Sequence, residues 1–149
     1  MSESIIQKIS LFFFYAFLDE RQAIVASKKA IDVLNKKVSL SEGTGNAPDL
    51  EPSLIIHIIF KIWKSMKDSN SLSFTNFNLE AGWIVPEDIN LGLWRQFLKD
   101  ASEPELHAAI LSQILFFSDA DISKGLGVTV GTVRMRTSYA LRKLGALRL

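Results

Sequence analysis

Apolar residues recur at intervals of three and four along most of the chain, and no run alternates strictly between apolar and polar positions. This periodicity is typical of amphipathic helices and predicts an all-α protein. The expected helices cover residues 4–18, 20–36, 52–67, 91–99, a stretch that begins at 102, and two further segments after 118. Residues 39–51, which are rich in Gly, Ser, Asn and Pro, predict a loop. Residues 68–90 lack helical periodicity and predict a linker.

Two of the expected helices are unusually apolar. The run 9–18 is too short to span a bilayer and lacks the basic start of a signal peptide, so we expect a buried helix. The helix 52–67 carries isoleucine on more than one side, which indicates burial or contact with a partner. We favour a central buried helix, and a partner surface remains the alternative.

The segment after residue 118 has the signals of two short helices joined by a tight turn. Ser118 and Asp121 form a candidate capping box at the first helix start. Gly127 suits the left-handed residue that ends a helix, and Thr129 can cap the next one. Together these signals predict a helix-turn-helix, whose second helix enters the major groove of DNA.

The second helix of this motif is basic, and the charge of the chain is unevenly distributed. The chain has 17 basic and 16 acidic side chains, but residues 122–149 hold six basic and no acidic ones. A basic end on an otherwise acidic chain favours phosphate binding. The alternative is an ordinary amphipathic helix with a solvated basic face. Its predicted apolar stripe comprises Val133, Ala140, Leu141 and Leu144.

Roles in DNA binding follow from position along this helix. A phosphate would lie at its N-terminus, near Thr129, and Gly131 would permit a close approach of DNA or of the preceding helix. Early side chains read bases and later ones meet phosphates, although Arg136 lies three residues from an apolar position and can instead pack at the motif edge. The predicted DNA-binding residues are Thr129, Thr132, Arg134, Arg136, Arg142 and Lys143.

The sequence from Trp94 to Leu144, and above all GVTVGTVRMR followed by ALRKL, resembles the fourth region of bacterial sigma factors of the extracytoplasmic-function group. The order of apolar helix, Asp19, Ala23 and second helix resembles the second sigma region more faintly. The resemblance implies two small helical domains: residues 1–67, a linker 68–90, and a four-helix domain 91–149 that holds the helix-turn-helix. It also implies promoter DNA, core RNA polymerase and an anti-sigma protein as partners.

The resemblance places the polymerase contact on the second helix, at Ala23, Ser27, Lys28 and Ile31. Family members carry an acidic segment there, whereas this chain has Ala23-Ile24-Val25-Ala26-Ser27-Lys28-Lys29. Two functions therefore stay open. One is a sigma-like protein that initiates transcription, which the two-part layout favours. The other is a sigma-derived regulator or interaction module that does not initiate transcription, which the lost acidic segment favours.

The amino-acid composition and a few residue positions narrow the possible classes of function. The chain has no cysteine, so we expect no disulfide, zinc finger or thiol chemistry. The glycines near residue 44 lack the lysine-serine pair of a phosphate-binding loop. His57 and His107 lie on different expected helices with no adjacent nucleophile or acid, so each is expected in the core or on the surface. We expect no enzyme, cofactor or metal, no membrane partner, and a cytoplasmic location.

Overall fold

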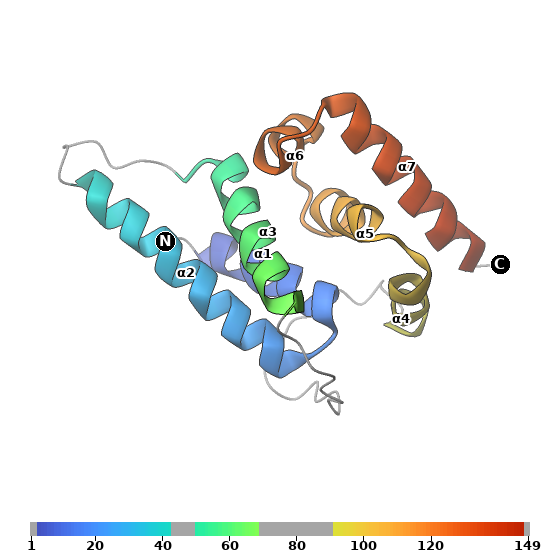
Figure 1. Ribbon diagram of the computed structural model, residues 1–149, viewed down its shortest axis with the longest axis horizontal. Helices are drawn as coiled ribbons and strands as arrows, with labels where there is room; N and C mark the ends of the chain where they lie inside the picture. The colour runs from blue at the N-terminus through green and yellow to red at the C-terminus, as the bar shows by residue number, and fades with distance from the viewer. Residues whose placement is uncertain (1–2, 43–49, 69–90, 148–149) are drawn as a thin grey trace.

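The computed structural model describes residues 3–42, 50–68 and 91–147, and these residues form an all-α fold, as predicted. Seven α-helices and one π-helical segment follow each other in the described ranges (Figure 1). They are α1 (Glu3–Phe17), α2 (Glu20–Glu42), α3 (Pro52–Asp68), α4 (Leu91–Asp100), α5 (Glu103–Ala109), η2 (Ile110–Ile114), α6 (Asp119–Leu126) and α7 (Val130–Leu147).

The predicted boundary at the end of α2 is wrong. The loop was expected from residue 39, but the helix continues to Glu42. Ala30 and Leu34 are fully buried and Val38 is half-buried, so the apolar stripe extends at four-residue spacing past the predicted end. Residues 43–49 of that loop lie outside the described residues, as do 69–90 of the predicted linker with Phe74, Phe77 and Trp83, whereas Leu50 and Glu51 are described and non-helical, as predicted.

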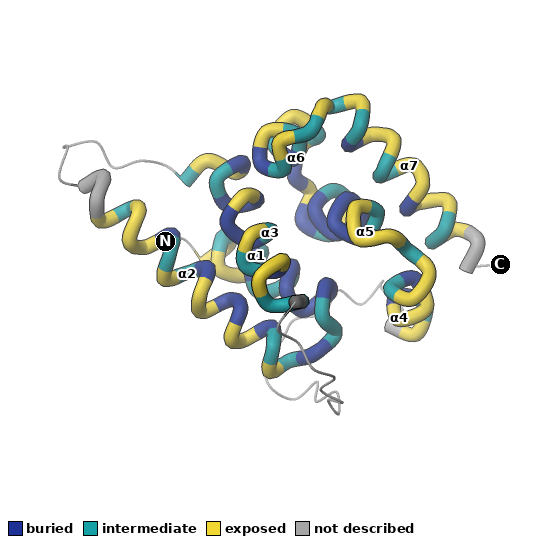
Figure 2. The backbone as a smooth tube through the Cα atoms, viewed as in Figure 1, coloured by how far each residue is buried: buried dark blue, intermediate teal, exposed yellow. Residues whose placement is uncertain are grey.

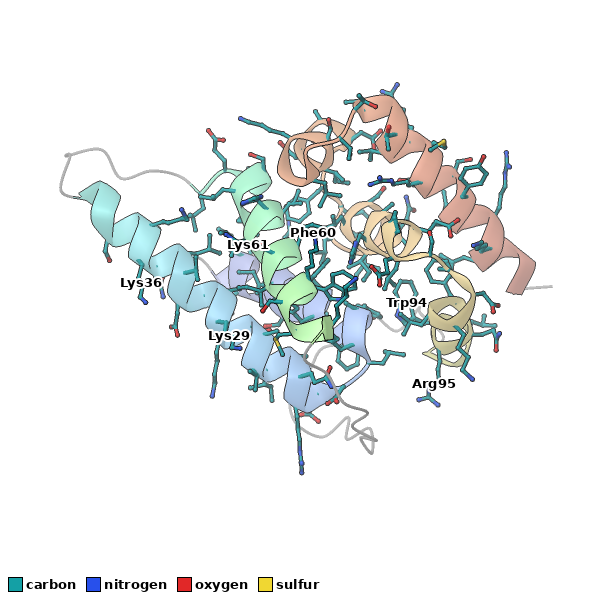
Figure 3. All side chains as sticks on the ribbon, in the orientation of Figure 1. Lys29, Lys36, Phe60, Lys61, Trp94 and Arg95 are labelled. Atoms are coloured by element: carbon teal, nitrogen blue, oxygen red, sulfur yellow. The ribbon has the colours of Figure 1, made fainter. Side chains whose placement is uncertain are left out.

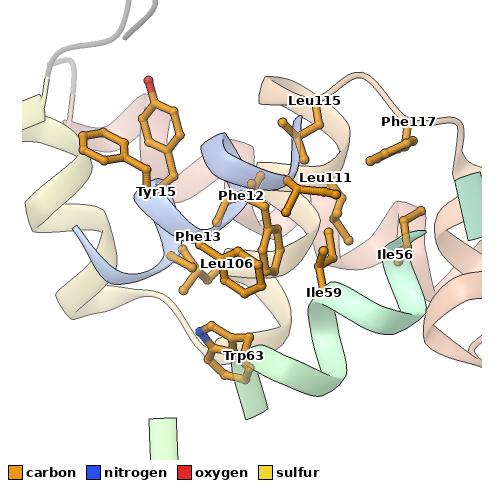
Figure 4. Close-up of a cluster of buried hydrophobic side chains, with 14 of the residues drawn as sticks. Phe12, Phe13, Tyr15, Ile56, Ile59, Trp63, Leu106, Leu111, Leu115 and Phe117 are labelled. Carbon is orange, nitrogen blue, oxygen red and sulfur yellow. The ribbon is translucent and has the colours of Figure 1, made fainter. Parts of the chain in front are cut away.

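The buried core takes side chains from all of the described helices, and α1, α3 and α5 meet within it. Phe12 and Phe13 of α1, Ile59 and Trp63 of α3, and Leu106 of α5 converge in one cluster (Figure 4). The expectation that both apolar runs are buried helices is therefore confirmed. No helix within the described ranges has the length and apolar character needed to cross a bilayer.

The same cluster includes side chains from before and after the predicted linker. Leu111 and Leu115, at the end of the α5–η2 segment, belong to it together with Ile56 and Ile59 of α3 (Figure 4). The described helices thus share one core. The assignment of 1–67 and 91–149 as separate domains stays a prediction.

A close approach of α6 to α3 fixes the position of the last two helices. Gly125 lies on the buried side of α6, and a Cβ atom built there would stand 2.6 Å from Cβ of Ile56 and 2.9 Å from the Ser53 carbonyl oxygen. Only a glycine leaves room for this packing. Lys124 pairs with Glu51 at 3.3 Å across the same junction.

A buried indole links α4 to α1. Trp94 Nε1 donates a 2.8 Å hydrogen bond to the carbonyl oxygen of Tyr15, and the two rings meet edge to face at 5.3 Å. Trp94 points into the body of the protein, whereas its neighbour Arg95 points outward (Figure 3). The α4 helix, which also packs on α7, is thereby tied to the N-terminal helices.

Candidate nucleic-acid interface

The turn between α6 and α7 is built by local capping. Ser118 Oγ accepts a 3.1 Å hydrogen bond from the Asp121 N–H at the start of α6. Gly127 ends that helix in the left-handed region, with φ of 70°. Thr129 Oγ1 accepts a 3.1 Å bond from the Thr132 N–H and thereby caps α7. The predicted caps at Gly127 and Thr129 are confirmed, and Ser118 caps α6 through one half of the predicted capping box, the bond that its side chain accepts.

One side of α7 packs against the rest of the protein. Val133 and Ala140 are 1% and 0% exposed, and Thr137 lies half-buried between them. Leu141, predicted on this stripe, is instead 45% exposed. It directly follows Ala140, and one residue turns an α-helix by about 100°, so Leu141 lies to one side of the stripe that Val133 and Ala140 define.

The opposite side of α7 is open to solvent. Gly131, Met135, Ser138 and Arg142 are all exposed and follow one another at helical spacing. In Figure 2 the outer side of α7 shows exposed segments, and its buried segments face α5. We call the surface formed by these four residues the open face. Arg142 lies over the ring of Tyr139, 5.6 Å from its centre, at the edge of this face.

Arg134 flanks the open face on the side of α6. Its side chain is 72% exposed, and Nε lies 3.3 Å from Oδ2 of Asp119 in the first turn of α6. An ion pair with this much exposure is weak and readily exchanged for another anion. Arg134 is thus oriented by α6 while its guanidinium stays accessible to DNA.

Arg136 and Lys143 lie on the other flank, which faces α5. The Lys143 ammonium donates to Oε1 of Glu105 at 2.7 Å and to the carbonyl oxygen of Asp100 at 3.2 Å. Arg136 is half-buried, and its charge helps to lower the pKa of His107. Two of the six predicted DNA-binding residues therefore lie on the α5 side of the helix, and the structure does not bring them together with Arg134.

The contact of Lys143 with Glu105 also secures the start of α5. Ser102 and Glu105 form a capping box there, with Pro104 in the first turn, and this cap accounts for the predicted helix start at residue 102. The hydrogen bond from Lys143, followed by bonds from Ser102, lowers the pKa of Glu105. The carboxylate stays ionised and binds α7 to α5 beneath the open face.

His107 lies at the centre of the core. Its ring is 4.1 Å from that of Trp63 and 5.3 Å from that of Phe60, centre to centre, and it is 3% exposed. Burial, reinforced by the charges of Lys67 and Arg136, lowers its pKa to about 3. Among the described residues none forms a hydrogen bond with Nε2. The neutral ring packs like a hydrophobic residue, so His107 is a core histidine, whereas His57 is exposed.

The predicted polymerase contact on α2 is only partly accessible. Ala23 is fully buried, and Ser27 is 5% exposed with its hydroxyl donating to the carbonyl oxygen of Ala23. Ile31 is half-buried, and Lys28 is exposed. Lys29 and Lys36 also point outward from α2 (Figure 3). The surface that α2 presents in this region is therefore lysine-rich.

The described residues contain no group of three or more His, Cys, Asp or Glu side chains placed to bind a metal ion. Comparison of the chain with protein-family models, curated proteins and solved structures found no match. The similarity to sigma factors rests on the sequence motifs alone.

Two features of the interface escaped the sequence-based prediction. The half-exposed side chain of Tyr139 lies among the arginines of α7 but was assigned no role, whereas half-exposed Met135, which stands where sigma factors usually have a small polar residue, was expected to alter base preference. The close backbone approach was expected at Gly131 and occurs at Gly125, since a Cβ at Gly131 would meet only Thr129 Oγ1 at 3.9 Å. The sequence carried a signal that Met135 is exposed, because a residue two positions after the buried Val133 faces away from the core.

Proposed function

We propose that this chain is a sigma-factor-like transcription protein, in which α6 and α7 form a helix-turn-helix and α7 reads a promoter element in duplex DNA. The observation that carries the proposal is the open face of α7. It is accessible along its length, it is bordered by Arg134 and includes Arg142, and it is held by a capped turn. Rigid presentation of basic side chains on one helix face suits the major groove.

The roles of the basic residues follow from their surroundings. Arg134 is near the start of α7, where an arginine can form a bidentate contact with guanine. Arg142 lies two turns later and is assigned to a phosphate. Lys143 and Arg136 are assigned to support α7 from the α5 side, because each faces charged or polar groups of the protein.

Binding to duplex DNA at increasing salt tests the proposal. We expect affinity to fall steeply between 50 and 200 mM salt, because each phosphate contact releases counterions. Arg142→Ala should weaken all sequences alike and reduce the slope of log affinity against log salt by about 0.9. Arg134→Ala should weaken a selected site more than random DNA. Equal losses for both variants on both DNAs would refute this division of roles.

The second candidate function is a sigma-derived DNA-binding regulator that does not initiate transcription. Burial of Ala23 and Ser27 and the lysine-rich surface of α2 favour it. A pull-down of core RNA polymerase from the native host separates the two. Sub-micromolar binding supports initiation, with an anti-sigma protein as a further partner to seek. DNA binding without polymerase binding supports the regulator.

A further inference from the structure

The centre of the open face carries an apolar side chain. Met135 is 50% exposed, lies one turn after Gly131 and one turn before Ser138, and has Arg134 beside it. It lies on the side of α7 opposite the buried Val133 and Ala140, so the core does not account for it.

The neighbouring charges indicate what covers this side chain. Arg134 is 72% exposed on one side, and Arg142 lies further along the same face. A polyanion would pair with the arginines, and a polyanion that also offers an apolar group would bury the Met135 side chain. Duplex DNA does both in its major groove, where phosphates border the groove and the C5 methyl group of thymine projects into it.

We propose that Met135 packs against the C5 methyl group of a thymine and makes α7 selective for thymine over cytosine at that base pair. This inference rests on the proposed DNA-binding function. Cytosine has hydrogen in place of the methyl group, and the groove edges of adenine and guanine offer mainly polar atoms. The unbranched thioether of methionine is flexible enough to reach a methyl group from the second turn of a helix.

The position of Met135 also explains why Arg136 is unsuited to the same base. Arg136 is turned toward α5 and is half-buried near His107, about 100° around the helix from Met135. The exposed long side chains available to base edges in the first two turns are therefore Arg134 and Met135, beside the shorter Thr132. The preferred site should combine a guanine, read by Arg134, with a nearby thymine.

Replacement of thymine by deoxyuridine tests the contact directly, because it removes only the methyl group. Sites bound by the full chain are first selected from a random duplex library. Each thymine in the selected site is then replaced singly by deoxyuridine. We expect one position to lower the affinity of the wild-type chain about four-fold, the effect of burying one methyl group.

Three variants make this test specific. Met135→Ala should bind the thymine site more weakly and should no longer distinguish deoxyuridine from thymine. Met135→Leu, which keeps an apolar side chain, should retain the distinction. Leu141→Ala is the matched control: it removes another half-exposed apolar side chain from α7, six residues further along, and should leave the deoxyuridine effect unchanged.

Each possible outcome either supports or overturns the contact between Met135 and thymine. A deoxyuridine effect that vanishes only in Met135→Ala supports the contact. A selected site that is indifferent to deoxyuridine at every position, or an effect that persists in Met135→Ala, overturns the thymine contact and leaves DNA binding standing. Absence of salt-dependent duplex binding by the wild-type chain overturns the proposed function and the inference together.

Discussion

Two glycines of the α6–α7 region, Gly125 and Gly131, mark surfaces of opposite character. Gly125 lies on the closed side, where α6 approaches α3 so closely that an added Cβ would overlap Ile56. Gly131 lies on the open face of α7, where an added Cβ would meet nothing nearer than 3.9 Å. Glycine thus permits the close packing of two helices at Gly125. We propose that at Gly131 it permits the close approach of DNA.

The largest expected effect on stability comes from disrupting the packing of α6 against α3. Gly125→Ala forces a methyl group against Cβ of Ile56 and a backbone oxygen, neither of which can move without shifting α3. We expect the free energy of unfolding to fall by about 3 kcal/mol, at the upper end of overpacking costs. Urea unfolding measures it. Gly145→Ala is the control, because a Cβ there has no neighbour within 4 Å; equal effects of the two substitutions would contradict the close packing.

The next largest expected effect on stability comes from the titration of His107, which is buried in the core. Its pKa is about 3 in the folded protein and about 6.5 when unfolded, so between these values the unfolded chain binds a proton that the native protein does not. Stability contributed by the neutral ring is present above pH 6.5 and is lost as pH falls toward 3. From pH 7 to 5 we expect a loss of about 2 kcal/mol from this group.

His107→Phe keeps a ring in the core and removes the titration. Urea unfolding of both proteins at pH 7 and 5 isolates the histidine contribution as the difference between their pH dependences. Identical pH dependences would show that His107 titrates normally in the native protein.

A smaller effect separates the two ion pairs of α7. Lys143→Ala leaves Glu105 without its lysine partner at a site where the carboxylate is only 12% exposed, and should cost about 1 kcal/mol of stability. Arg134→Ala removes a far more exposed pair and should change stability by less than about 0.5 kcal/mol. Thermal unfolding of both variants ranks them, and the reverse order would contradict the assignment of Lys143 to support and Arg134 to binding.

A small increase in stability is expected from a substitution that tests the open face. Gly131→Ala should stabilise the free protein by about 0.5 kcal/mol, because alanine is the better helix former and space is available. The same methyl group should lower DNA affinity about tenfold if the groove wall approaches the backbone there. A variant that is more stable and binds DNA equally well would show that Gly131 is not needed for access. Gly145→Ala again serves as the control.

Features that depend on neighbouring residues were predictable from the sequence. The start of α5 at Ser102, the left-handed Gly127 and the cap at Thr129 all depend on side chains within a few positions. The burial of residues 9–16 and of the α3 isoleucines followed from apolar content alone. Such signals are local, so the helix order and most boundaries could be derived without a structure.

Features that depend on another helix were not predictable. The need for glycine at 125 comes from Ile56 and Ser53, about 70 residues earlier in the chain. Lys143 was expected to contact phosphate, but it bonds to Glu105, and this contact depends on where α5 lies. The left-handed backbone and 81% exposure of Phe116, after the π-helical end of η2, also lack a sequence signal, since glycine is the usual residue in that conformation.

The packing of α3 against α6 has a consequence during synthesis on the ribosome. About 60 residues separate the end of α3 from the end of α6, the helix that covers part of its apolar surface. At about 5–20 residues per second, that surface stays uncovered for roughly 3–12 seconds after α3 has been made. We therefore expect the isoleucines that stabilise the finished core to be exposed to chaperones that recognise apolar segments while the chain is being made.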